Sequence, residues 1–139
     1  MDLDPLAISG SALASQRARM NVVTENLANA DTTRTPRGGP YRRRKVVFEA
    51  QGNAFDQLLG AQGGRGVRAI GVVDAQTPLR RVHQPGHPDA DAEGYVTYPN
   101  VNSVMEMVDL MAATRAYEAN VTAIQALKSM VQKALELGR

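Results

Sequence analysis

Four consecutive basic residues, Arg42–Lys45, form the stretch of the sequence that could most plainly bind a ligand. Clusters of Arg and Lys neutralise phosphates, so a nucleic-acid site is the first hypothesis. However, the run begins a strand-like segment, in which successive side chains point to opposite faces, and Tyr41 is the only aromatic residue beside it. These features favour a solvated basic edge, or one that pairs with a partner, over nucleic-acid binding.

The basic character of the chain is confined to this region. Residues 34–45 contain six basic and no acidic residues, whereas the whole chain has a net charge of +2, so the rest carries −4. The alternative interpretation is a basic coiled-coil protein that binds nucleic acid or acts as an adaptor. Salt-dependent retention of DNA or RNA through Arg42–Lys45 would identify it.

A second stretch, His83–Gly94, carries groups that bind metals. Its oxygen ligands alternate as in the first half of an EF-hand calcium loop, at Asp89, Asp91 and Glu93, and Gly94 follows where that loop has the glycine of its sharp turn. The match then fails, because the twelfth position is Asn100 instead of Glu, and Pro85 and Pro88 are incompatible with the entering helix. We therefore expect a rigid turn and no metal site.

Groups for nucleophilic catalysis are scarce. The chain has no Cys, which excludes disulfides and thiolate metal sites, and it has no G-x-S-x-G motif. Gly63–Gly66 is rich in glycine but lacks the strand and helix that flank a phosphate-binding loop. We expect a protein that is not an enzyme and carries no cofactor.

The elements that must position these residues divide the chain into three regions. The first, residues 1–33, is expected to form a coiled-coil helix of about 25 residues, with Pro5 at its first position. Its apolar stripe repeats every seven residues and consists of Leu6, Leu13, Met20, Val23 and Leu27.

The third region, residues 101–139, is expected to form a second coiled-coil helix of about 35 residues. Ser103 and Glu106 fit a capping box at its start, and Gly138 is a candidate C-cap. Its heptad stripe includes Met107, Leu110, Tyr117, Val121, Ile124, Val131 and Leu135.

Residues 34–100 form an extended connector and a small β-rich region. Short strands are predicted at Tyr41–Phe48, Val67–Val73, Leu79–Val82 and Tyr95–Tyr98. Gln51–Gly66 is predicted to be a flexible loop. The expected fold class is therefore mainly α, with two long terminal helices paired as a coiled coil and a small β-rich insertion between them.

Helix length predicts the shape of the molecule. A helix of about 35 residues is about 52 Å long, which exceeds the diameter of roughly 37 Å of a compact domain of this size. The chain should be elongated. Apolar residues off the two stripes, namely Val22, Val104, Val108 and Met111, should need further helices from other subunits.

The first segment has acidic residues, Asp2 and Asp4, and no basic n-region, so no Sec-type signal peptide is expected. Nor does any apolar run approach the ~18 residues of a membrane span.

The sequence resembles the bacterial flagellar axial and rod protein family. The similarity covers roughly residues 5–48 and 85–139, and it is carried by the following motifs: NVVTENLANADTTRT, GGPYRRRKVVF, PGHPDADAEGYVTYPNVN, MVDLMAATRAYEANVTAIQALKSM and KALELGR. Within the family, the Gly-Gly-Pro-Tyr and HPDADAEGYV elements point to the proximal-rod members.

This resemblance implies a structural subunit of the periplasmic rod, the drive shaft that transmits motor torque to the hook and filament. It implies export through the flagellar type III apparatus without a cleaved signal. It also implies assembly with itself, with other rod subunits and with inner-membrane ring or adaptor proteins, without binding nucleic acid or inserting into the membrane.

Two further groups of residues are assigned roles in such an assembly. The helix-exit turn, which we expect to hydrogen-bond the local backbone, comprises Asn26, Asn29, Asp31, Thr32 and Thr33. Candidate electrostatic contacts between subunits join Arg42, Arg43, Arg44 and Lys45 to Asp89, Asp91 and Glu93.

Overall fold

The computed structural model describes residues 4–51 and 66–137. The order of its elements is α1 (Asp4–Ala28), β1 (Arg44–Ala50), β2 (Val67–Asp74), β3 (Arg80–His83), β4 (Tyr95–Tyr98) and α3 (Ser103–Leu137). Most of the loop predicted at residues 51–66, and the C-cap predicted at Gly138, lie outside the described residues.

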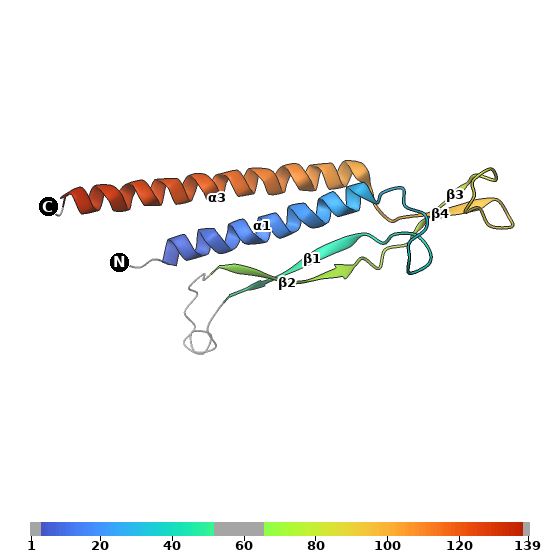
Figure 1. Cartoon of the computed structure of the whole chain (residues 1–139), viewed down its shortest axis with the longest axis horizontal. Coiled ribbons are helices and arrows are strands. Elements are labelled where there is room, and N and C mark those ends of the chain that lie inside the picture. The colour runs from blue at the N-terminus through green and yellow to red at the C-terminus, as the bar shows by residue number, and fades with distance from the viewer. Residues whose placement is uncertain (1–3, 52–65, 138–139) are drawn as a thin grey trace.

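The two helices have the predicted lengths, 25 residues for α1 and 35 residues for α3. They lie side by side and antiparallel along the long axis of the molecule, which is elongated as expected (Figure 1). The ten additional residues of α3 correspond to about 15 Å of helix, which extends beyond the first turn of α1.

The start of α3 differs from the predicted capping box. The side-chain Oδ1 of Asn102 accepts hydrogen bonds from the backbone N–H groups of Val104 (3.1 Å) and Met105 (3.2 Å), so Asn102 is the N-cap. Glu106 does not reach back to the helix end, because its carboxylate is buried and bonds to Asn26 of α1 and to Arg43, the residue before β1.

The face of α3 that packs on α1 is rotated relative to the predicted stripe. Of the predicted stripe, Met107 (54%), Val131 (36%) and Leu135 (63%) are exposed. The buried and partly buried residues of α3 are Glu106, Asp109, Leu110, Ala113, Ala116, Tyr117, Asn120, Val121, Ile124 and Leu127. Polar and small residues occupy part of this face, which the hydrophobic pattern alone could not reveal.

On α1, the predicted stripe faces the interior. Val23 is buried, and partly buried positions are Leu6, Leu13, Met20 and Leu27. Val22, which we expected to need another subunit, is buried within the chain, where it lines a groove with Val46 and Phe48 of β1.

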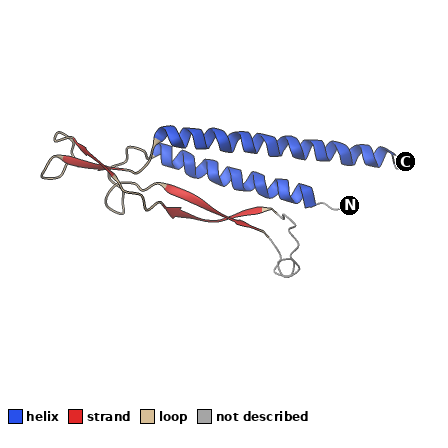
Figure 2. Cartoon of the chain, turned by 180° about the vertical axis from the view of Figure 1, so that it is seen from behind, coloured by secondary structure: helices blue, strands red, loops and turns tan. Residues whose placement is uncertain are grey.

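The four predicted strands are present with shifts of a few residues at their ends, and they form two antiparallel hairpins. Strand β1 pairs with β2, with an irregularity between Val47 and Phe48. Strand β3 pairs with β4 from Arg80↔Tyr98 to His83↔Tyr95. The β1–β2 hairpin lies along α1, whereas β3–β4 projects beyond the ends of the helices (Figures 1 and 2).

Helix α1 is the middle layer, between α3 and the β1–β2 hairpin (Figure 1). Two serines of α1 attach the hairpin to it. Ser15 Oγ donates to the Val67 carbonyl (3.0 Å), and the Val67 N–H donates to Ser11 Oγ (3.1 Å). Both backbone groups of Val67 are therefore satisfied by the helix.

Candidate functional site: a polar junction

The end of α1 is joined to β1 and α3 by the buried side chain of Asn26. Its Nδ2 donates to Glu106 Oε2 and to the Arg44 carbonyl, both at 2.9 Å. Its Oδ1 accepts from Tyr41 OH (3.0 Å) and from the Arg44 N–H (2.9 Å). The full hydrogen-bonding capacity of this amide is used, as the burial of a polar group requires.

Glu106 is the second buried member of this cluster, with 0% exposure. Its other oxygen, Oε1, accepts a charge-assisted hydrogen bond from Arg43 Nε. Arg43 also reaches Asp109 Oδ2 (3.3 Å), and Arg19 of α1 lies 3.5 Å from the other oxygen of Asp109. The buried carboxylate is thus paired, which is the condition under which a charge is tolerated in the interior.

Tyr41 packs at the same place and is 8% exposed. Burial, followed by the nearby Glu25 carboxylate, raises the pKa of Tyr41 from 10.0 to about 12. The phenol therefore stays protonated well above neutral pH, and it can donate its hydrogen bond to Asn26 throughout the physiological range.

Asn100 connects the segment before α3 to the same site. Its Oδ1 accepts from the Arg43 N–H (2.7 Å), and its Nδ2 donates to the carbonyl groups of Ala75 (3.2 Å) and Thr77 (3.0 Å). We call the set of Asn26, Tyr41, Arg43, Asn100 and Glu106 the polar junction. It ties together the end of α1, the start of β1, the residues that follow β2 and the start of α3.

Half of the predicted basic run belongs to this junction or its border. Arg43 pairs with Glu106 and Asp109, and Arg44 pairs with Glu25 (2.6 Å) and Asp74 (3.7 Å). Arg42 and Lys45 are exposed. The geometry of Arg43 and Arg44 is that of intramolecular ion pairs.

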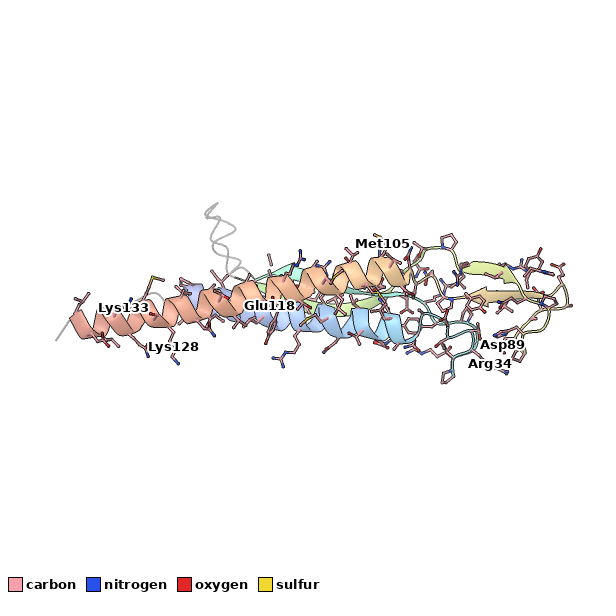
Figure 3. All side chains as sticks on the ribbon, turned by 90° about the horizontal axis from the view of Figure 1, so that it is seen from above. Arg34, Asp89, Met105, Glu118, Lys128 and Lys133 are labelled. Atoms are coloured by element: carbon pink, nitrogen blue, oxygen red, sulfur yellow. The ribbon has the colours of Figure 1, made fainter. Side chains whose placement is uncertain are left out.

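The acidic residues proposed as their partners lie elsewhere. Asp89 accepts from Thr33 Oγ1 (2.7 Å) and lies 3.9 Å from Arg34 (Figure 3). Asp91 pairs with Arg81 (2.7 Å), and Glu93 is exposed. Within one chain, therefore, this acidic cluster contacts Arg34 and Arg81 instead of Arg42–Lys45.

The segment that resembled half of a calcium loop is a tight turn. Asp91 Oδ1 accepts from the backbone N–H of Tyr95 (2.8 Å) and of Glu93 (3.0 Å), and the Tyr95 bond is the main reason why the pKa of Asp91 is lowered. Gly94 has φ +78°, which permits this turn. Among residues 4–51 and 66–137, no group of three or more His, Asp or Glu could hold a metal ion.

Some residues of the predicted helix-exit turn make the local hydrogen bonds that were expected. Asn29 Nδ2 donates to the Glu25 carbonyl (2.9 Å), and Thr32 Oγ1 donates to Asn29 Oδ1 (3.2 Å). Asp31 is exposed, and Thr33 binds Asp89. The expectation is wrong for Asn26, whose partners are 15 to 80 residues away.

Sequence reasoning did not assign roles at this site to Tyr41, Asn100 or Glu106. One signal was available: Glu106 lies one heptad before Ala113, on the side of α3 that faces α1. A carboxylate at such a position indicates a buried partner of opposite charge. The hydrogen bonds and ion pairs of the polar junction hold segments of the chain together. Its geometry therefore supports a structural role.

Two protein-family models match the chain, one near each end. Residues 6–34 match the family "Flagella basal body rod protein", and residues 92–137 match "Flagellar basal body rod FlgEFG protein C-terminal". The flagellar basal-body rod protein FlgC of Bacillus subtilis (strain 168) is 46% identical, over 96% of both chains. The chain belongs to the FlgC family of flagellar basal-body rod proteins.

Other members of the FlgC family are similar over nearly their whole length. The protein from Salmonella typhimurium is 47% identical over 95% of this chain and 94% of its own. The protein from Borreliella burgdorferi is 41% identical over 94% and 93%, respectively. The chain is thus a structural subunit of the flagellar basal-body rod, in agreement with the resemblance noted in its sequence.

Neither described helix contains an apolar stretch long enough to cross a membrane.

Proposed function

We propose that this chain polymerises into the proximal rod, with its terminal helices paired as a coiled coil in the inner part of the assembly. The rod would then act as the drive shaft that transmits motor torque to the hook and filament. In this role the polar junction holds the helices and the β-hairpins of each subunit in a fixed arrangement.

The observation that carries this proposal is the apolar face of α3 that points away from α1. Val104 is 70% exposed, Val108 is 50% exposed and Met111 is 55% exposed. Their spacing of four and three residues places them on one face of the helix. Contiguous exposed apolar residues mark interaction surfaces, since their burial against a neighbour stabilises the assembly.

The far end of α3 supports the same proposal. Here the helix extends beyond α1, and its exposed apolar residues are Met130, Val131, Leu135 and Leu137. Lys128 and Lys133 lie on the same part of the helix (Figure 3). A helix with uncovered apolar residues gains most of its stability from tertiary or quaternary packing.

The partners that we propose are further copies of this chain, other rod subunits and the inner-membrane ring or adaptor proteins. The flagellar type III export apparatus would deliver the chain to the periplasm. We propose no cofactor, no nucleic-acid ligand and no insertion into the membrane.

The experiment is complementation of a strain that lacks its own copy of this protein. Val108→Asp places a charge on the exposed face without disturbing α1, and it should abolish rod assembly and swimming while the chain is still expressed. Leu27→Asp and Ile124→Asp, at half-buried positions between the helices, should have the same effect.

Thr122→Asp is the matched control. Thr122 is exposed and continues the face of Val108 by helical spacing, but it lies between the exposed apolar residues at 104–111 and those at 130–137. This variant should assemble and swim. Normal swimming of the Val108, Leu27 and Ile124 variants would contradict the proposed role of the helices.

A further inference from the structure

The apolar contacts between α1 and α3 do not by themselves define one alignment of the two helices. Leu110, Tyr117 and Ile124 follow one another at seven-residue intervals on the face of α3 that packs on α1. A shift of α3 by one heptad, about 10.5 Å, that brings Tyr117, Ile124 and Val131 to these positions would place a large apolar residue at each of them again, whereas the opposite shift would bring Ser103 to the position of Leu110. The repeat therefore tolerates more than one register.

The buried polar residue on this face breaks the repeat. Glu106, Ala113, Asn120 and Leu127 share one heptad position, and only Glu106 among them carries a charge. In the observed register its carboxylate meets Asn26 on α1 and Arg43 before β1. One heptad away, Ala113 would face Asn26 and leave its amide without this acceptor.

We propose that Glu106 is a positioning residue that selects a single register of α3 on α1. A buried carboxylate is tolerated only where its partners are, so alternative registers are disfavoured even though their apolar contacts are similar. Because Arg43 binds the same carboxylate, the register also determines where the β1–β2 hairpin leaves the helices. The inference concerns the single chain and does not depend on the proposed function.

The absence of Cys from the sequence allows this register to be measured by engineered disulfides. Thr114 Oγ1 and Met20 Sδ are 3.7 Å apart, so Met20→Cys with Thr114→Cys reports the observed register. Met20→Cys with Met107→Cys, or with Val121→Cys, reports a shift of one heptad in either direction. Each pair is oxidised in the dilute, purified full-length chain, and intramolecular disulfides are quantified by mass spectrometry.

With Glu106 present, the 20–114 disulfide should exceed either shifted disulfide by about tenfold or more. Glu106→Leu should keep the helices paired, because the apolar contacts remain, but it should raise a shifted disulfide to within about threefold of the 20–114 product. Glu106→Gln keeps one acceptor oxygen, for Asn26 or for Arg43 but not for both in the observed geometry, so its preference for the 20–114 disulfide should lie between those of the Glu106 and Glu106→Leu chains. Glu118→Leu is the matched control, since Glu118 is exposed on the same helix.

Three results would overturn the inference. The first is formation of only the 20–114 disulfide by the Glu106→Leu chain, which would show that the short connection at residues 99–102 holds α3 in place. The second is loss of all three disulfides in that variant. The third is shifted disulfides in the unaltered background, or no 20–114 disulfide there.

Discussion

Asn26 Nδ2 lies 2.9 Å from Glu106 Oε2, although 80 residues separate the two in the sequence and both side chains are buried. This contact joins the end of the first helix to the start of the last one. Arg43, which binds the same carboxylate, adds the start of the β1–β2 hairpin. One amide and one carboxylate therefore connect the three layers of the molecule.

Asn26→Asp should destabilise the chain by about 3 kcal/mol, because a second buried carboxylate would face Glu106 and could no longer donate to the Arg44 carbonyl. Urea unfolding monitored by circular dichroism measures the change. Asn21→Asp is the control, since Asn21 is exposed on the same helix and its replacement should change stability by less than about 0.5 kcal/mol. Equal effects of the two variants would contradict the assigned role of Asn26.

The raised pKa of Tyr41 predicts that the folded chain loses stability at alkaline pH. Its pKa is raised to about 12 by burial, above the 10.0 of an unperturbed tyrosine, so the folded chain favours the neutral phenol. This contribution is complete below the unfolded pKa and is lost as the pH rises through the folded one. Unfolding free energies measured between pH 9 and pH 12 should fall less steeply for Tyr41→Phe than for the unaltered chain.

The N-cap of α3 can be tested by two adjacent substitutions. Asn102→Ala should cost about 1 kcal/mol, because the N–H groups of Val104 and Met105 lose their acceptor. Ser103→Ala should be nearly neutral, since Ser103 is exposed and is not the cap. Thermal or urea unfolding measures the loss of stability in each variant. A larger loss for Ser103→Ala than for Asn102→Ala would contradict the N-cap role of Asn102 and favour the capping box expected from the sequence.

Replacement by alanine should lower the stability of the chain at Gly66 and raise it at Gly10. Gly66 has φ +97°, and an added Cβ would overlap Ser11 Oγ, so Gly66→Ala should destabilise the attachment of the hairpin to α1 by about 1–3 kcal/mol. Gly10 is an exposed residue within α1 with open space around it, so Gly10→Ala should stabilise the chain by about 0.5–1 kcal/mol. Urea unfolding of the two single variants measures both signs, and stabilisation by Gly66→Ala would contradict the geometry at Ser11.

The secondary structure was largely predictable from local patterns. Both helix lengths and all four strands follow from apolar periodicity and from the positions of Gly and Pro, because backbone preferences act over a few neighbouring residues. The rigid turn within His83–Gly94 was likewise predictable, from Pro85 and Pro88. The elongated shape followed from the length of α3 alone.

The candidate site was much less predictable. In the sequence, Asn26 has the type and position of a helix-exit residue, and Glu106 has those of a capping-box residue. Neither side chain makes the local hydrogen bonds expected from its sequence neighbours. Their partners are brought to them by the packing of α1 against α3 and β1. The roles of the basic residues Arg42–Lys45 also depend on packing. In the folded chain Arg43 and Arg44 form intramolecular ion pairs, whereas Arg42 and Lys45 are exposed.

By itself, then, the sequence determined the family, the helices, the strands and the elongated form of this protein, since short-range propensities and helix length suffice for these. Only the tertiary structure decided which face of α3 packs on α1, that Val22 is covered by the β1–β2 hairpin, and that a carboxylate is buried at Glu106. The physical reason is that burial of a polar group depends on whether its partner is within about 3 Å, and that distance exists only in the folded chain.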